Sequence, residues 1–386
     1  MMKLCEEKPH LTDHERKQVS DRLRVFNHTT TQEDLFVAGA EGGGDFPSLS
    51  YGDSYVYTAV AQATVYKTDA VSGLREVSPA PESVFNFALI PEDEGARRAS
   101  LDDAFASLAG ASLSEVIEAS DYKQLKAMES RRPASVDELR QHLIRPHAAD
   151  AGNLGIQLRS TAELGAVLRL LRSNANLSYI FIDGTLSLPL VGKPDVSLFY
   201  EHLKRLCCVE ARKRSVGFFT LSRAHGLPAI ESLEELAREK WGTGSGNVAE
   251  HWYFRLPVPD VDRWETSLTQ KRRLPPPGAV TYLIRFHRTT ATMRLDMDRE
   301  FWLSSVRGVT EEKTQENERT IFGNLDYLTH DQRCYGYPYP LRAAHDRTML
   351  TKLERSALRK QIIDAAVRAG MKRSLFREVA QAADVA

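Results

Sequence analysis

The 386-residue sequence lacks a long hydrophobic run. Its longest apolar stretches, among them Leu177 to Ile182 and Val216 to Leu221, are far shorter than the roughly 20 residues that a helix needs to cross a bilayer. The polar start, Met1 to His14, also lacks the apolar region of a secretory signal peptide. We therefore expect a cytoplasmic protein without a membrane segment.

Cysteine is scarce as well. The four cysteines form no CxxC pair and have no histidine at zinc-finger spacing: Cys5, Cys207, Cys208 and Cys334. Their arrangement argues against both a disulfide framework and a structural zinc site. We expect them to be reduced residues that mostly fill space in the core.

The chain has almost no net charge, −1 by formal count, so it has no overall attraction to nucleic acid. Any contact with DNA must therefore come from local groups of basic residues. Two such groups are present, at 204–223 and 352–377. The first contains Arg212, Lys213, Arg214 and Arg223. Each group can equally be the solvated face of a helix.

Strand and helix signals alternate along the chain. Short segments rich in Val, Ile, Phe, Thr and Tyr predict strands at 35–40, 55–66, 177–182, 216–221, 252–256, 281–286 and 290–295. Helical spacing predicts helices at 11–26 and 233–240, and a third helix carries the apolar stripe Leu164, Val167, Leu168 and Leu171. A glycine-rich turn is predicted at 41–44. This order predicts an α/β fold.

We expect one domain over residues 1–386, with a helical elaboration at 79–150 and a helical tail at 351–386. The tail begins with Thr351 and Glu354 at the spacing of a capping box, in which each residue satisfies a backbone N–H at the start of a helix.

Acidic residues stand at the ends of three predicted elements. Asp183 and Gly184 follow the strand at 177–182, at the end where α/β sheets place functional side chains. Glu41 follows the first strand, and Glu163 is predicted to begin the helix before 177–182. Mg²⁺ and Mn²⁺ prefer carboxylate oxygens, and such ions activate water in phosphodiester hydrolysis. Two structural interpretations stay open: an ordinary Asp-Gly turn, and a capping box formed by Ser160 and Glu163.

Four groups of segments follow one another along the chain: LFVAGAEGGGDFP with YGDSYVY, STAEL leading into YIFIDGTLSLPL, LSRAHGLP, and GYPYPLRAAHDR. Together they span Leu35 to Arg347, and in this order they resemble the NurA nuclease family. The resemblance implies an RNase H-like core, a mixed sheet flanked by helices, in which carboxylates hold Mn²⁺ or Mg²⁺. It also implies cleavage of DNA as an endonuclease and as an end-resecting exonuclease.

The resemblance assigns roles to individual residues. Asp183 matches the family's strand-end Asp and Glu163 its helical Glu, both as metal ligands. Tyr337 and His345 match its C-terminal Tyr and His. Tyr337 is then expected to hydrogen-bond the scissile phosphate, and His345 to bind the metal or position the attacking water. Apart from the resemblance, His345 beside Asp346 would be interpreted as a surface or capping residue.

Two positions depart from the family pattern. Glu41 stands where the family usually has Asp, so the first metal ligand is one methylene longer. Asp53 is the second choice for this role, and Asp45 is a further alternative. Arg223 stands where the family commonly has Lys, and either residue offers a positive charge to a phosphate.

The resemblance further implies a homodimer that docks on a hexameric HerA-like ATPase and cuts DNA in end processing or antiviral defence. The chain lacks the G-x-x-x-x-G-K-[ST] motif of such a motor, because Gly192-Lys193 is followed by Pro194. The alternative is a NurA-like subunit whose Glu41 has weakened catalysis, and which clamps DNA or regulates the motor.

Overall fold

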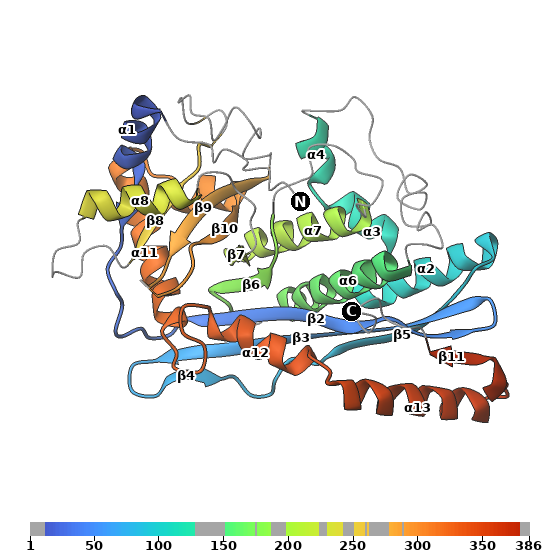
Figure 1. Ribbon diagram of the computed structural model, residues 1–386. Helices are drawn as coiled ribbons and strands as arrows, with labels where there is room; N and C mark the ends of the chain where they lie inside the picture. Colours follow the sequence, from blue (N-terminus) through green and yellow to red (C-terminus); the bar gives the residue numbers. More distant parts are fainter. Residues whose placement is uncertain are drawn as a thin grey trace, which may run out of the picture.

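The computed structural model describes residues 12–127, 151–173, 176–186, 198–223, 230–241, 251–258, 261, 278–287 and 289–378. One sheet of 11 strands runs through this part of the chain (Figure 1). Its strands are β1 Arg24–Val25, β2 Phe36–Tyr51, β3 Ser54–Asp69, β4 Gly73–Glu76, β5 Val84–Pro91, β6 Tyr179–Asp183, β7 Gly217–Ser222, β8 Trp252–Arg255, β9 Ala279–Arg285, β10 Met293–Asp298 and β11 Phe376–Glu378.

Helices cover both faces of this sheet. They are α1 Asp13–Arg22, α2 Glu94–Ala109, α3 Leu113–Ala119, α4 Tyr122–Ala127, α6 Ala151–Arg172, α7 Leu198–Lys213, α8 Ile230–Trp241, α10 Arg299–Phe301 with the π-helical turn η2 Trp302–Val306, α11 Glu311–Thr329, α12 Tyr339–Thr348, α13 Lys352–Arg368 and the 3-10 turn η3 Arg373–Leu375. Among the described residues, no helix has both the length and the apolar character needed to span a membrane.

The strand order is β1-β8-β9-β10-β7-β6-β2-β3-β4, and β5 and β11 pair with β3 and β2. Strands β2, β6 and β7 are parallel, whereas β3 and β10 are antiparallel to their neighbours β2 and β7. Helix α6 lies between β5 and β6 along the chain, and α7 lies between β6 and β7. The predicted α/β class is confirmed: the fold is a mixed sheet flanked by helices.

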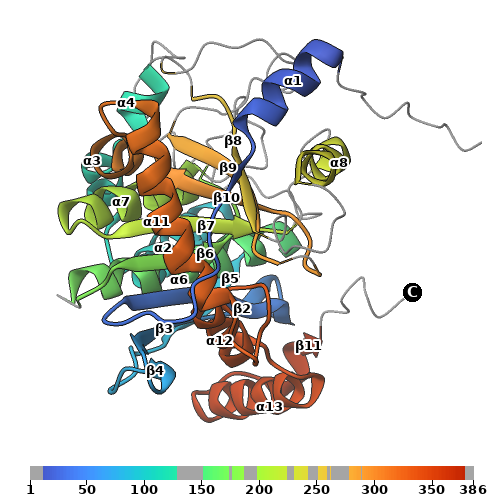
Figure 2. The same ribbon diagram turned by 90° about the vertical axis from the view of Figure 1, so that its left-hand side faces the viewer.

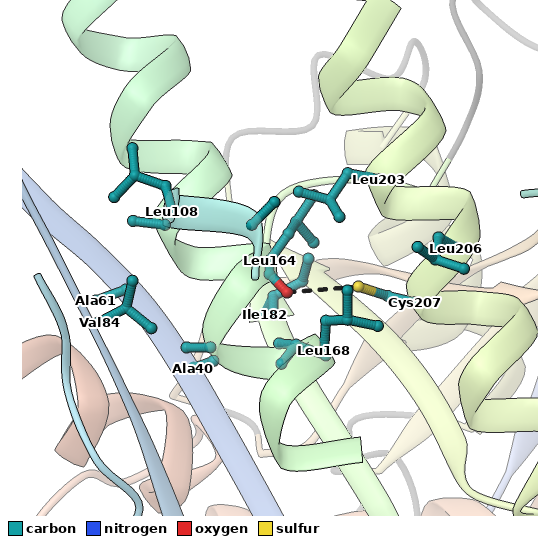
Figure 3. Packing of buried hydrophobic residues seen from close by; sticks show 14 of the residues in the cluster. Ala40, Ala61, Val84, Leu108, Leu164, Leu168, Ile182, Leu203, Leu206 and Cys207 are labelled. Carbon is teal, nitrogen blue, oxygen red and sulfur yellow. Dashed lines mark hydrogen bonds between the residues drawn. The ribbon is translucent and has the colours of Figure 1, made fainter. Parts of the chain in front are cut away.

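The larger core lies between the sheet and the helices α2, α6 and α7. Leu164 and Leu168 of α6 pack there with Ala40 of β2 and Ile182 of β6 (Figure 3). Cys207 of α7 is fully buried in the same layer, and its thiol donates to the carbonyl of Leu164 at 3.5 Å. The prediction that cysteines fill space therefore holds for Cys207 and for its buried neighbour Cys208, both of which are free thiols.

A second core lies on the opposite face of the sheet. Helices α11 and α12 lie on that face (Figure 2). Phe322 and Leu325 of α11 and Leu341 of α12 pack there against the aromatic residues Phe181 and Phe219 of β6 and β7. The central strands are thus buried on both sides, which explains their nearly continuous hydrophobic sequences.

The glycine-rich segment after Ala40 is not the predicted turn, because β2 continues straight through it to Tyr51. A Cβ added at Gly39 or Gly43 would lie 2.4 Å or 2.3 Å from backbone atoms of α12. One added at Gly42 would lie 2.6 Å from the carbonyl oxygen of Arg159 on α6. The glycines therefore allow one helix to touch the backbone of β2 on each face.

Two further expectations need correction. Glu163 does not begin a helix, because α6 starts at Ala151, so Ser160 is not its N-cap. The segment 79–150 contains helices α2 to α4, but it opens with the strand β5, and residues 128–150 lie outside the described residues. The capping box of Thr351 and Glu354 is present at the start of α13.

Replacing Gly43 by alanine is expected to destabilise the protein. The new methyl group would meet the carbonyl oxygen of Thr348, so α12 must move, and overpacking of this kind typically costs about 1–3 kcal/mol. The free energy of unfolding in urea measures the effect. Gly152→Ala is the matched control, because a Cβ there meets nothing within 4 Å. Equal stability of the two variants would contradict the close contact of β2 with α12.

Candidate metal centre

Strands β6 and β7 end beside the middle of the longer strand β2, and polar side chains meet there. Ala40 of β2 pairs with Ile182 of β6, which places Glu41 beside Asp183. Asp183 in turn pairs with Leu221 of β7, and Ser222 and Arg223 follow it. The register of the sheet therefore brings Glu41 of β2 close to Asp183 and Arg223 at the ends of β6 and β7.

These residues line a pocket of about 230 Å³ whose other walls come from the C-terminal part of the chain. Helix α12 contributes Arg342 and His345, and the loop before it contributes Tyr337. His345 Nδ1 lies 3.8 Å from Glu41 Oε1. The guanidinium of Arg223 stacks over the Tyr337 ring, 4.2 Å from its centroid. The pocket thus combines acidic, basic and aromatic groups.

Glu163 approaches the same place from the opposite face of the sheet. It lies in the middle of α6 and is buried, and the backbone N–H of Gly42 favours its charged form, which lowers its pKa. Its charge interacts with those of Glu41 and Asp183. Three carboxylates therefore converge from β2, β6 and α6.

The proximity of these carboxylates changes their acidity. Burial, followed by the charge of Asp183, raises the pKa of Glu41 to about 7. Burial, followed by the charge of Glu41, raises the pKa of Glu163 well above its ordinary value. Burial also raises the pKa of Asp183, although Arg223, Arg159 and His345 oppose the shift. Without a cation, the site favours carboxyl groups that keep their protons.

Tyr337 is the neutral group of the pocket. Burial, followed by the charge of Asp183, raises the pKa of its phenol, so the hydroxyl keeps its proton and can donate a hydrogen bond.

The donor set suits a hard divalent cation. Glu41, Glu163 and Asp183 offer carboxylate oxygens, which Mg²⁺ and Mn²⁺ prefer, and His345 adds one ring nitrogen nearby. A bound cation would favour the charged form of all three carboxyl groups. The residues present therefore fit such an ion.

Arg159 was missed by the sequence analysis. It lies on α6 one helical turn before Glu163, and its charge acts on all three carboxylates. The i, i+4 spacing of Arg159 and Glu163 predicts that the two side chains lie on one face of a helix. This prediction requires that the helix begin before Ser160. Arg342 was missed too, although it stands one turn before His345 on α12.

Asp53 does not join the cluster. It lies in the turn between β2 and β3, which is roughly 30 Å along β2 from Glu41 at the usual rise of a strand. Asp45 lies on β2, but its side chain is outside the described residues.

The other basic residues of the 204–223 group are not gathered with Arg223. Arg212 is half-buried and forms ion pairs with Asp121 and Asp298 at 2.7 Å. Lys213 and Arg214 both pair with Glu210. These residues precede β7, whereas Arg223 follows it, so they lie at opposite ends of that strand.

Comparison with known proteins finds NurA structures. The crystal structure of the NurA nuclease from Sulfolobus solfataricus is 13% identical, and the alignment covers 92% of this chain and 91% of that chain with a TM-score of 0.45. A NurA structure bound to dAMP and manganese is 12% identical, with 93% of each chain covered and a TM-score of 0.38. No protein-family model matches the chain. No curated protein matches it either.

The raised pKa of Glu41 predicts a pH dependence of stability in metal-free protein. Between its ordinary 4.5 and about 7, the folded protein holds a proton that the unfolded chain releases. The contribution of Glu41 to stability is therefore fully present below the lower value and is lost as pH rises to the upper one. Glu41→Gln should reduce the fall in the free energy of unfolding between pH 4.5 and about 7. Urea unfolding in EDTA across this pH range measures the effect.

Glu76→Gln is the control for this measurement. A hydrogen bond from Arg347 lowers the pKa of Glu76, so that carboxyl titrates below the window. If Glu76→Gln flattens the curve as much as Glu41→Gln does, the burial of Glu41 is not its cause.

Proposed function

We propose that the protein is a divalent-metal-dependent nuclease that hydrolyses DNA phosphodiester bonds. The observation that carries the proposal is the convergence of Glu41, Glu163 and Asp183 beside a pocket that also holds basic groups. Carboxylates alone would indicate a cation site but not the reaction that the cation serves. The adjoining Arg223 and Arg342 give the pocket an affinity for an anionic substrate such as a phosphodiester.

In this proposal, Glu41, Glu163 and Asp183 hold Mn²⁺ or Mg²⁺, and His345 is a fourth ligand or a group that positions water. The ion, when bound, supplies an activated water and neutralises the leaving oxygen. Hydrolysis joins the water oxygen to phosphorus, breaks the bond from phosphorus to the leaving deoxyribose oxygen, and transfers a proton from the water to that oxygen.

The protein's own side chains orient the phosphate. Arg223 has a fork of donors that can bind two phosphate oxygens at once. Its guanidinium lies over the Tyr337 ring, 4.2 Å from the ring centroid, and this cation–π contact holds it at the pocket. The neutral phenol of Tyr337 donates a hydrogen bond to the scissile phosphate. Arg342, one turn before His345 on α12, adds a second positive charge to the pocket.

The substrate, DNA, and the partner come from the resemblance of the four sequence segments to NurA nucleases. On that basis we propose a cytoplasmic homodimer that acts with a hexameric HerA-like ATPase, in DNA end processing or in defence against phage. The second candidate is a DNA-clamping or regulatory subunit of weak activity, which the longer Glu41 favours.

The first test is cleavage of linear DNA in Mn²⁺, with and without a HerA-like ATPase. Asp183→Asn keeps the shape of the side chain but removes a metal-binding charge. We expect it to lower the rate by more than about 100-fold, because even outer-shell changes at metal sites cost roughly 10–100-fold. EDTA should abolish cleavage by the wild type.

Asp53→Asn is the matched control, since it removes the same charge in the distal turn and should cleave normally. Wild-type protein that binds DNA without cutting it would favour the clamping subunit. Cleavage that persists in Asp183→Asn would overturn the proposed site.

The second test concerns the phosphate contact. Arg223→Gln should weaken DNA binding and reduce the slope of log K against log salt by about 0.9, the value for one lost phosphate contact. Lys213→Gln, which removes a charge at the other end of β7, should change the slope much less. Fluorescence anisotropy with labelled duplex over a salt series measures both. Equal slopes for wild type and Arg223→Gln would exclude this contact.

A further inference from the structure

Three histidines and one aspartate meet at a second place, distinct from the carboxylate pocket. His28 follows β1, His251 precedes β8, Asp326 lies in the last turn of α11, and His330 follows that helix. One ligand atom from each of the four lies within 4.8 Å of the others. None of these residues lines the pocket of Glu41 and Asp183.

Asp326 is the centre of this group and is fully buried. Its Oδ2 accepts a hydrogen bond from the backbone N–H of Thr29 at 2.8 Å and lies 2.8 Å from His28 Nδ1. Its Oδ1 is buried but accepts no hydrogen bond from the described residues. A buried carboxylate oxygen that accepts no hydrogen bond is costly, so it points to a cation as its partner.

The surroundings of Asp326 Oδ1 have the spacing of a metal site. His330 Nδ1 lies 3.3 Å away and His251 Nε2 lies 3.5 Å away. Ligand atoms at the corners of a tetrahedron with zinc-ligand bonds of about 2.05 Å are separated by about 3.3 Å. His330 Nδ1 also lies 2.7 Å from the carbonyl oxygen of Asp326. A metal that took this nitrogen would displace its proton, as metal binding to imidazole generally does.

We propose that His28, His251, Asp326 and His330 form a structural site for Zn²⁺. Three imidazoles and one carboxylate match a tetrahedral zinc set, whereas Mg²⁺ and Mn²⁺ favour oxygen donors. The site joins the segment after β1 to the end of α11 and to the start of β8. A pocket of about 620 Å³, lined by His28 and His330 among others, gives an ion access from solvent. The proposal does not depend on the proposed nuclease function.

The zinc content of protein expressed without a histidine tag tests this site. The protein is stripped with a chelator, reloaded with Zn²⁺, passed over a desalting column and analysed by mass spectrometry. We expect one Zn²⁺ per wild-type chain that excess Mn²⁺ does not displace. Co²⁺ in its place should show the visible absorption of a tetrahedral site.

Variants assign the ion to its ligands. His28→Gln and His330→Gln should each weaken Zn²⁺ affinity by more than the roughly 10–100-fold typical of outer-shell changes. His287→Gln is the matched control, because that ring lies 6.1 Å from the His330 ring but belongs to no part of the ligand set. Asp183→Asn separates this site from the carboxylate pocket and should retain the zinc.

Thermal unfolding tests the structural role of the zinc and distinguishes a lost metal site from a variant that fails to fold. Zn²⁺ should raise the Tm of the wild type by several degrees, because it binds only the folded state. It should not raise the Tm of His330→Gln, whose metal-free circular dichroism spectrum should match that of the wild type. The proposal is overturned if the wild type binds no zinc, if His28→Gln and His330→Gln both keep it, or if Asp183→Asn loses it.

Discussion

The backbone of β2 touches a helix on each face, and the arrangement of the carboxylates follows from these two contacts. Gly39 and Gly43 leave room for α12, and Gly42 leaves room for the chain of α6 at Arg159. Side chains at these positions would hold both helices away from the strand. Glu163 from one face and His345 from the other could then not reach the surroundings of Glu41.

The same close contacts remove water from the acidic groups. Glu41, Glu163 and Asp183 all have raised pKa values, and burial is the largest cause in each case. The positive groups that oppose this are Arg159 and, for Asp183, Arg223 and His345 as well. Their charge does not offset the burial. The fold thus gathers three carboxyl groups whose negative charge the neighbouring basic side chains do not fully neutralise. Either a divalent cation or protons retained on the carboxyl groups must neutralise the rest.

The sequence predicts the parts of this site that depend on local pattern. The strand before Asp183 and the α/β order are readable from hydrophobic runs, and the capping box of Thr351 marks α13 correctly. Local sequence patterns do not predict contacts between segments that are far apart in the chain. Glycines beside Glu41 have the composition of a turn, but they pair with β3 as a strand and lie against α6 and, about 300 residues later in the chain, α12. The histidines near Asp326 come from three such segments, so no spacing rule reveals them.

Glu41 in place of an aspartate is compatible with this geometry. Side chains alternate along β2, and Ala38 and Ala40 face the core under α6, so Glu41 faces α12 together with Gly39 and Gly43. Its nearest neighbours on that face have no side chains, so the longer arm meets no crowding within its own strand. The extra methylene carries the carboxylate toward α12, where Oε1 lies 3.8 Å from His345. An aspartate would hold its oxygens closer to β2 and farther from this ring. In the proposed site, the longer residue therefore draws the cation toward His345 and the open side of the pocket.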